Sequence, residues 1–251
     1  MVSVIVVTYN SEKCIFKCLQ SLKGALKDSD EVIVVDNSNK DYGIPGVIVN
    51  PSGSYPSGLN AGIRIATQPI LVCTNPDVTF KSDSIVNMVR GLEFGYSVVG
   101  PMTDMASGIQ GFKLALPHQA MAIDARFLIG FCFALPRTAY DAIGPFDERF
   151  VYEQDDLDYS LRARQAGMKL GIVPHSFVQH EGNASAVTNP KILDMRFESF
   201  FKMFEKYPDM DFIQTLGSGW PYQWFIEVSN RYPQVKQIKS FQLALTQHEG
   251  K

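Results

Sequence analysis

Short, almost wholly apolar runs alternate in the first third of the chain with segments whose apolar residues recur at helical spacing. The runs at residues 2–7, 31–36 and 69–74 are rich in β-branched side chains, which is typical of strands buried on both faces of a parallel sheet. Leucines at helical spacing predict a helix over residues 11–26. The chain therefore begins as strand, helix, strand, and we expect the first strand to be central and the ligand crevice to lie at the carboxyl ends of the strands.

The rest of the pattern predicts an α/β domain followed by helices. Further strands are expected at residues 47–49, 97–100, 127–135, 169–173 and 177–180, and further helices through residues 60–66, 84–92, 136–143 and 155–166. Gly167 is the expected cap of the last of these helices, and residues 103–125 carry only a weak pattern. Beyond Pro190, an aromatic stripe from Phe197 to Phe204 predicts a helix packed into a core.

These elements predict a Rossmann-like mixed sheet flanked by helices over residues 1–188. Residues 189–251 are expected to form a helical C-terminal extension that packs on this domain or extends from it. Nothing in the sequence indicates an internal repeat or a low-complexity linker.

Composition narrows the class of protein. Of the 251 residues, 45% are hydrophobic and 20% charged, with a formal net charge of -3, so there is no electrostatic case for binding nucleic acid. The longest apolar stretch, residues 2–7, is far shorter than the roughly 20 residues of a membrane helix and lacks the flanks of a signal peptide. We therefore expect a cytoplasmic protein without a transmembrane segment, for which peripheral contact with a membrane stays open.

Several nucleotide-binding and hydrolase motifs are missing where they would be expected. The turn after the first strand reads Thr-Tyr-Asn-Ser at 8–11, which is neither the GxGxxG of a dinucleotide fold nor the GxxxxGK[ST] of a phosphate-binding ATPase. No serine nucleophile elbow is present. Instead, acids follow strands or begin helices; these are Asp36, Asp77, Glu153, Asp155, Asp156 and Asp158.

Seven short motifs occur in an order that resembles the inverting, GT-A-fold glycosyltransferases of family 2, particularly their rhamnosyltransferase branch. Each motif is weakly specific alone, but together they cover roughly residues 2 to 185. They are VIVVTYN at 4–10, VIVVDN at 32–37, GLNAG at 58–62, NPD at 75–77, GPFDERF at 144–150, DDLDYSLR at 155–162 and HEGNAS at 180–185. The family's usual Glu-Asp-x-Asp-Leu is replaced here by DDLDY at 155–159, and the loop at 52–55 is out of step by about one residue.

The resemblance implies an enzyme that moves a sugar, with L-rhamnose as the leading candidate, from a UDP- or dTDP-sugar to a hydroxyl of a glycan or glycoconjugate. Such a reaction needs a cation to neutralise the departing diphosphate and a base to accept the proton of the acceptor. Two rival functions stay open. A sugar-nucleotide nucleotidyltransferase would normally show a glycine-rich basic loop after its first strand, and a non-catalytic nucleotide-sugar-binding protein would have no need of the acid cluster.

By the same resemblance, the ends of the first two strands bind the nucleotide. Thr8, Tyr9 and Asn10 would line the base pocket, and the Asp36 carboxylate would accept the N3–H of a pyrimidine. The alternative for Asp36 is a structural aspartate in a turn after a strand. Asn60 and Gly62 would lie near the donor sugar and diphosphate, although capping of a helix start would select the same residue types.

The resemblance also assigns a metal site and a base. Asn75 would contact the donor, while Asp77 and His180 would hold Mn²⁺ or Mg²⁺, a hard cation that completes its shell with diphosphate oxygens and water. Asn-Pro-Asp is also a favourable turn, and a histidine ending a strand is often structural.

For the base, Asp156 matches the second acid of the family's pair, and Asp155 lies beside it. Acids in the first turn of a helix would also stabilise it through the helix dipole without any catalysis.

Overall fold

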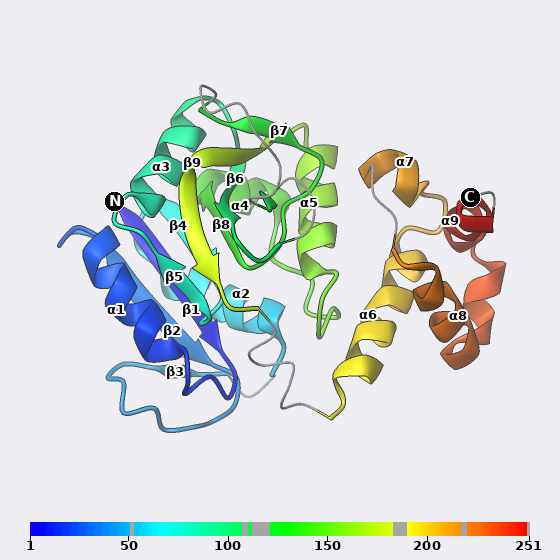
Figure 1. Cartoon of the computed structure of the whole chain (residues 1–251), viewed down its shortest axis with the longest axis horizontal. Helices are drawn as coiled ribbons and strands as arrows, with labels where there is room; N and C mark the ends of the chain where they lie inside the picture. The colour runs from blue at the N-terminus through cyan, green and yellow to red at the C-terminus, as the bar shows by residue number, and fades with distance from the viewer. Residues whose placement is uncertain (51–52, 107–109, 112–120, 183–189, 217–219, 250–251) are drawn as a thin grey trace.

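The structure of the chain is a computed structural model that describes residues 1–50, 53–106, 110–111, 121–182, 190–216 and 220–249. It is a mixed α/β fold followed by helices (Figure 1). In chain order the elements are β1 (Val2–Thr8), α1 (Ile15–Ala25), β2 (Glu31–Asp36), β3 (Ile48–Val49), α2 (Tyr55–Ile65), β4 (Ile70–Thr74), β5 (Val78–Phe80), α3 (Ser84–Glu93), β6 (Val98–Thr103), β7 (Ile123–Ala125), β8 (Cys132–Pro136), α4 (Arg137–Ile143), α5 (Asp155–Gln165), β9 (Leu170–His180), α6 (Ile192–Lys206), α7 (Phe212–Leu216), α8 (Tyr222–Arg231), η3 (Pro233–Gln237) and α9 (Lys239–Glu249).

The central sheet has the order β3-β2-β1-β4-β8-β6-β9-β5, with β7 paired to β9 outside this path. Strand β1 lies between β2 and β4 and is parallel to both, as the opening pattern predicts. Thr8 and Asp36 are register partners at the carboxyl ends of β1 and β2. Strand β8 is antiparallel to β4, which makes the sheet mixed.

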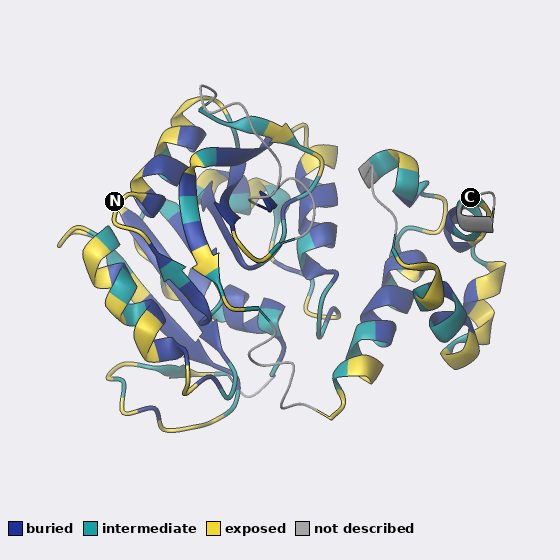
Figure 2. Ribbon diagram, viewed as in Figure 1, coloured by how far each residue is buried: buried dark blue, intermediate teal, exposed yellow. Residues whose placement is uncertain are grey.

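Two hydrophobic cores lie on opposite faces of the sheet, because successive side chains of a strand point to opposite sides. Val2, Val4 and Val6 of β1 belong to the same core as residues of α1 and α3, whereas Ile5 and Val7 belong to the core that contains residues of α2 and α5. Both faces of β1 are therefore buried, as Figure 2 shows by colour.

The C-terminal helices form a third core. It contains Phe150 before α5 together with Leu157 and Leu161 of α5, and these pack with phenylalanines of α6, α7, α8 and α9. The expected core packing of the aromatic stripe is confirmed, since Phe197, Phe200, Phe201 and Phe204 are all buried. The extension shares this core with α5. The boundary expected at residues 188 and 189 lies outside the described residues.

Some elements differ from the sequence expectation. Helix α1 begins at Ile15 and not near Ser11, because the Ser11 carbonyl accepts the amides of Cys14 and Ile15 in a turn before the helix. The strand expected over residues 127–135 begins only at Cys132. The two short strands expected at the end of the domain are one, β9, whose pairing with β6 shifts register between the two expected parts.

The short strand β5 was not predicted. Gly167 has a φ of 76° after α5, as expected of a C-terminal cap. The four cysteines are buried and free, as the sequence indicates. Within the described part of the chain, none of the helices has the length and apolar character needed to cross a membrane.

Candidate active site

Asp77 and His180 come together because β5 and β9 pair. Asp77 immediately precedes β5, and the register partner of Val78 is His180 at the end of β9. The Nε2 atom of His180 lies 3.4 Å from Oδ1 of Asp77, and the two side chains are 13% and 5% exposed. The antiparallel pairing of β5 with β9 thus joins two residues that are distant in sequence.

These two side chains fit a divalent cation. Among the described residues, Asp77 Oδ1 is a buried polar atom without a hydrogen-bond partner, and the nearest nitrogen of His180 is Nε2. Two ligands of one Mg²⁺ ion, each about 2.1 Å from it, come about 3 Å apart at right angles, close to the separation found. No group of three or more His, Cys, Asp or Glu side chains gathers as a metal site in the described ranges, so further ligands would be substrate oxygens and water.

The loop residues Gly130 and Phe131 join this pair to the acids of α5. The ring of Phe131 stacks on that of His180, with centroids 5.0 Å apart, and its carbonyl accepts the Asn75 amide at 2.9 Å. One residue earlier, the Gly130 amide donates to Asp156 Oδ2 at 2.8 Å. A Cβ atom at Gly130 would lie 3.0 Å from Asp156 Cβ, so the close approach favours glycine.

The sequence interpretation missed these two residues. It assigned them to the middle of a strand, since residues 127–135 form one nearly continuous apolar run. The glycine within that run was the available signal, because glycine in an apparent strand often marks a close approach of backbone.

Asp156 lies in the first turn of α5 with both carboxylate oxygens held. Oδ2 accepts from Gly130, and Oδ1 accepts the Leu157 amide at 2.7 Å. Burial raises the pKa of Asp156 to about 6, against the opposing effect of these two hydrogen bonds. Burial, followed by the charge of Asp156, raises the pKa of the neighbouring Asp155 well above its ordinary value. A carboxylate that ionises near pH 6 is suited to accept a proton near neutral pH.

The chain enters α5 through a strained segment. Glu153 and Gln154 both have positive φ values, 58° and 68°, which residues other than glycine rarely adopt and which cost on the order of 1–3 kcal/mol each.

Asp158, inside α5, is fully buried. Its oxygens accept from Arg162 at 2.9 Å and from the Tyr207 hydroxyl at 2.7 Å. Asp158 and Arg162 thus form an ion pair one turn apart on α5.

At the ends of β1 and β2, Thr8 and Asp36 are fully buried. Asp36 Oδ1 accepts from the amide and hydroxyl of Ser38, at 2.9 and 2.6 Å, and Oδ2 accepts the Lys40 amide at 2.8 Å. The Tyr42 hydroxyl lies 3.4 Å from Thr8 Oγ1 and 3.1 Å from Ser38 Oγ. Asp36 therefore organises the loop after β2 and, by count, uses three of its four acceptor positions in doing so.

Tyr9, Asn10 and Asn75 are partly exposed near the carboxyl ends of their strands. Asn10 has a φ of 50°, so the chain turns sharply after β1. The contacts of these three residues with a nucleotide remain predictions.

Asn60 and Gly62 have structural tasks that the sequence did not reveal. They lie in the interior of α2 and not at its start, which is capped by Ser54. The Asn60 amide nitrogen donates to Phe146 O and Glu148 Oε1, and its oxygen accepts from Phe146 N and the Tyr140 hydroxyl. These four bonds use the whole hydrogen-bonding capacity of the side chain.

Gly62 is needed where α2 crosses the sheet, because a Cβ there would lie 2.5 Å from Ile5 Cγ2. We therefore assign helix–sheet packing to Gly62 and anchoring of the turn at 144–150 to Asn60. The HEGNAS motif can be followed only as far as Gly182, since its last three residues lie outside the described ranges.

Solved structures with the same fold define the class. The mannosyltransferase PcManGT from Pyrobaculum calidifontis, in complex with GDP-Man and Mn²⁺, is 18% identical with a TM-score of 0.60, over 99% of this chain and 73% of that one. TarS 1–349 from S. aureus, in complex with UDP-GlcNAc, is 15% identical with a TM-score of 0.59, over 100% and 92%. The fold is therefore that of the GT-A glycosyltransferases.

The sequence comparisons narrow the class to a family. The profile of Glycosyl transferase family 2 matches residues 3–144, more than half of the chain, and the chain belongs to this family. The low-salt glycan biosynthesis hexosyltransferase Agl10 of Haloferax volcanii is 22% identical over 233 residues, which cover 80% of this chain and 71% of that protein. The chain is thus a glycosyltransferase, a class that uses nucleotide-sugar donors.

Proposed function

We propose that this protein is an inverting hexosyltransferase that transfers a sugar from a nucleoside-diphosphate donor to a hydroxyl of a glycan or glycoconjugate, with L-rhamnose from a UDP- or dTDP-sugar as the leading candidate. The observation that carries the proposal is the bridge at Gly130 and Phe131. It links the buried Asp77 and His180 pair to Asp156, whose pKa of about 6 lies in the range of a general base.

Asp77 and His180 would hold Mn²⁺ or Mg²⁺, which supplies positive charge to the leaving diphosphate. Asp156 would accept the proton of the acceptor hydroxyl as its oxygen bonds to the anomeric carbon. The bond from that carbon to the diphosphate oxygen breaks at the same time, and the electron pair leaves with the diphosphate. A single displacement of this kind inverts the anomeric configuration. The two backbone amides on Asp156 fix its carboxylate so that little reorganisation precedes the proton transfer.

Asp36 belongs to the proposed nucleotide site through its position at the end of β2, beside Thr8. Its buried carboxylate holds the loop that would cover the base, and the remaining acceptor position would face the N3–H of uracil or thymine. Tyr9, Asn10 and Asn75 would complete the donor pocket.

The test is a screen of UDP-, dTDP- and GDP-sugars for release of nucleoside diphosphate in Mn²⁺, in Mg²⁺ and in excess chelator. We expect one donor class to be hydrolysed slowly with metal and not with chelator. Asp77→Ala should abolish this metal dependence, whereas Asp83→Ala, which changes an exposed acid without a side-chain cap hydrogen bond, should not. With an acceptor, the product should show inverted anomeric configuration. Retained configuration, or equal rates in chelator, would contradict the proposal.

The same screen separates the rival functions. A nucleotidyltransferase would form a nucleotide sugar from a nucleoside triphosphate and a sugar phosphate, and a binding protein would retain its donor without turnover. The raised pKa of Asp156 supports an enzyme over a binding protein, because perturbed pKa values cluster at catalytic sites.

A further inference from the structure

We propose that helix α6 positions the acid helix α5, and that Arg196 acts as a positioning residue by holding Glu153. This inference rests on the proposed function, because it concerns the geometry of Asp156. The guanidinium of Arg196 donates to both oxygens of Glu153, from Nη2 at 2.8 Å and from Nε at 2.9 Å. Both side chains are partly buried, with exposed fractions of 23% and 32%. A bidentate pair of this kind fixes orientation as well as distance.

The segment that Arg196 holds has little local stabilisation of its own. Glu153 and Gln154 are consecutive residues with positive φ, and neither is a glycine. Gln154 caps α5 without a side-chain hydrogen bond, and its buried Oε1 is among the described polar atoms that lack a partner. Since conformations of this kind persist only where the surroundings enforce them, a contact from elsewhere in the fold must maintain this one.

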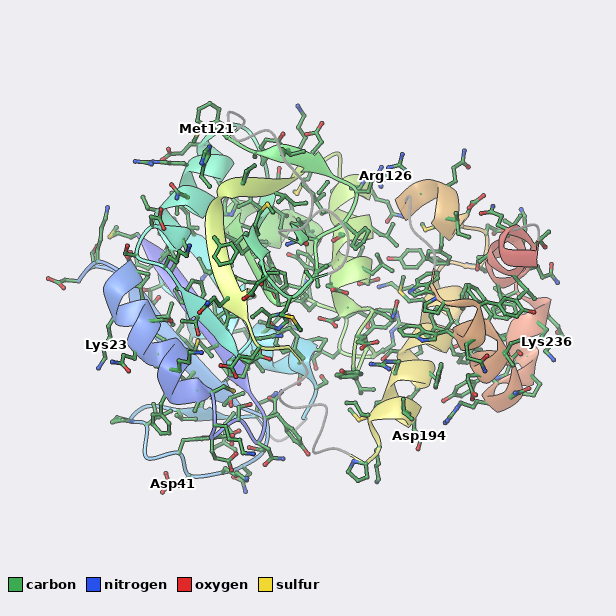
Figure 3. All side chains as sticks on the ribbon, in the orientation of Figure 1. Lys23, Asp41, Met121, Arg126, Asp194 and Lys236 are labelled. Carbon is green, nitrogen blue, oxygen red and sulfur yellow. The ribbon has the colours of Figure 1, made fainter. Side chains whose placement is uncertain are left out.

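Helix α6 supplies that contact along its length. The Ser199 hydroxyl accepts the Tyr152 amide at 3.3 Å, and the Lys202 ammonium donates to the Arg149 carbonyl at 2.9 Å. At the end of the helix, Lys206 lies 2.8 Å from Asp147 and 2.5 Å from Asp158. We define these residues together with Arg196 as the α6 clamp on residues 147–158. Figure 3 shows side chains filling the space between α5 and α6.

Lys206 reaches Asp158 inside α5, whereas Arg196 is the member of the α6 clamp that holds Glu153, in the strained segment that leads into the helix. Glu153 lies three residues before Asp156 and just outside α5, so a change in its backbone angles would rotate the start of the helix. That rotation would draw the Asp156 carboxylate away from the Gly130 amide. Arg196 itself contacts no reacting atom. Its loss should therefore lower kcat while the KM for the donor changes little, because Asp77 and His180 are placed by β5 and β9.

The experiment compares Arg196→Met, Glu153→Gln and the double variant, using nucleoside diphosphate release from the best donor of the panel in Mn²⁺. We expect each single variant to lose about tenfold or more in kcat, with a donor KM within about twofold of the original. The double variant should be no worse than the singles, because both break the same pair. Arg231→Met is the matched control. It breaks an ion pair between Arg231 of α8 and Asp194 of α6 but does not change a contact with residues 147–158.

Hydrogen exchange gives a second readout that needs no substrate. In Arg196→Met, the Gly130 and Leu157 amides should exchange at least tenfold faster, while the amides of β1 and β2 keep their protection. Unchanged exchange at both positions, unchanged kcat, or losses that add in the double variant would overturn the inference. An equal fall in protection across the whole chain would also overturn it, since it would show a merely structural role. Asp156→Asn separates the two claims, because normal turnover in that variant refutes the proposed base itself.

Discussion

The assignment of Asp156 as the base can be tested by removing its ability to accept a proton. At a pKa of about 6, some 97% of the carboxylate would be ionised at pH 7.5, by the ordinary titration relation. The rate of transfer should therefore be flat above about pH 7 and fall tenfold for each pH unit well below 6. Asp156→Asn should lower kcat by roughly 10²–10⁴-fold at neutral pH and should abolish this acidic limb.

The stability of the same variant provides a second measurement. Raising the pKa of Asp156 from 3.8 to about 6 costs the native state on the order of 3 kcal/mol once the group is ionised. Because the native state binds this proton more tightly, the contribution favours the fold below about pH 4 and is lost as the pH rises through about 6. Asparagine has no such titration, but its amide group cannot accept both the Gly130 and the Leu157 amide, which costs about 1–3 kcal/mol at every pH.

The difference between variant and original should consequently change with pH. Urea unfolding at pH 4 and pH 7 should show the free energy of unfolding of Asp156→Asn, relative to the original, improving by about 2 kcal/mol at the higher pH. A constant difference would mean that Asp156 has an ordinary pKa in the fold. Normal turnover in the variant would refute the mechanism, and loss in Asp155→Asn alone would move the base by one residue.

Three further substitutions test the roles of individual residues. Asp36→Ala removes three hydrogen bonds to Ser38 and Lys40, so calorimetry should show weaker nucleotide binding and the free energy of unfolding should fall by about 2–4 kcal/mol. If the folded variant binds the nucleotide with unchanged affinity, Asp36 is purely structural. Gly62→Ala should destabilise by about 1–3 kcal/mol through the contact with Ile5, whereas Gly24→Ala, in open space on α1, should be neutral or stabilising by up to about 1 kcal/mol in the same urea titration. Asn60→Ala should lower the free energy of unfolding by about 2–4 kcal/mol and leave donor affinity unchanged. Unchanged stability with weaker donor binding would instead support the predicted contact of Asn60 with the donor.

The sequence predicted the scaffold well where the signal was local. The apolar run of β1 and the helical spacing before β2 determine their elements within a few residues, and the strand, helix, strand opening follows from them. The placement of Asp77 beside His180 was implied only by the resemblance, because it depends on the pairing of β5 with β9. The sequence of residues 75–80 contains no pattern that predicts a strand as short as β5.

Other features could not be predicted because they depend on distant partners. The task of Asn60 becomes visible only when Phe146 is placed against α2, and the sequence alone suggests a helix cap. The pairing of Glu153 with Arg196 joins a turn to a helix that the family resemblance does not reach. The start of the strand predicted over residues 127–135 was wrong for a related reason. An apolar run does not show at which residue its hydrogen bonds to a neighbouring strand begin.

The shared core of α5 and the C-terminal helices has a consequence for synthesis of the chain. The sheet from β1 to β4 is formed by residues that leave the ribosome early, whereas Leu157 and Leu161 find their partners only in the helices that follow β9. At roughly 5–20 residues per second, the apolar face of α5 stays uncovered for several seconds on the nascent chain. Helix α5 is thus the last part of the site to complete its packing. A ribosome that stalls after β9 would leave a nearly complete sheet on which the apolar face of α5 is exposed to solvent.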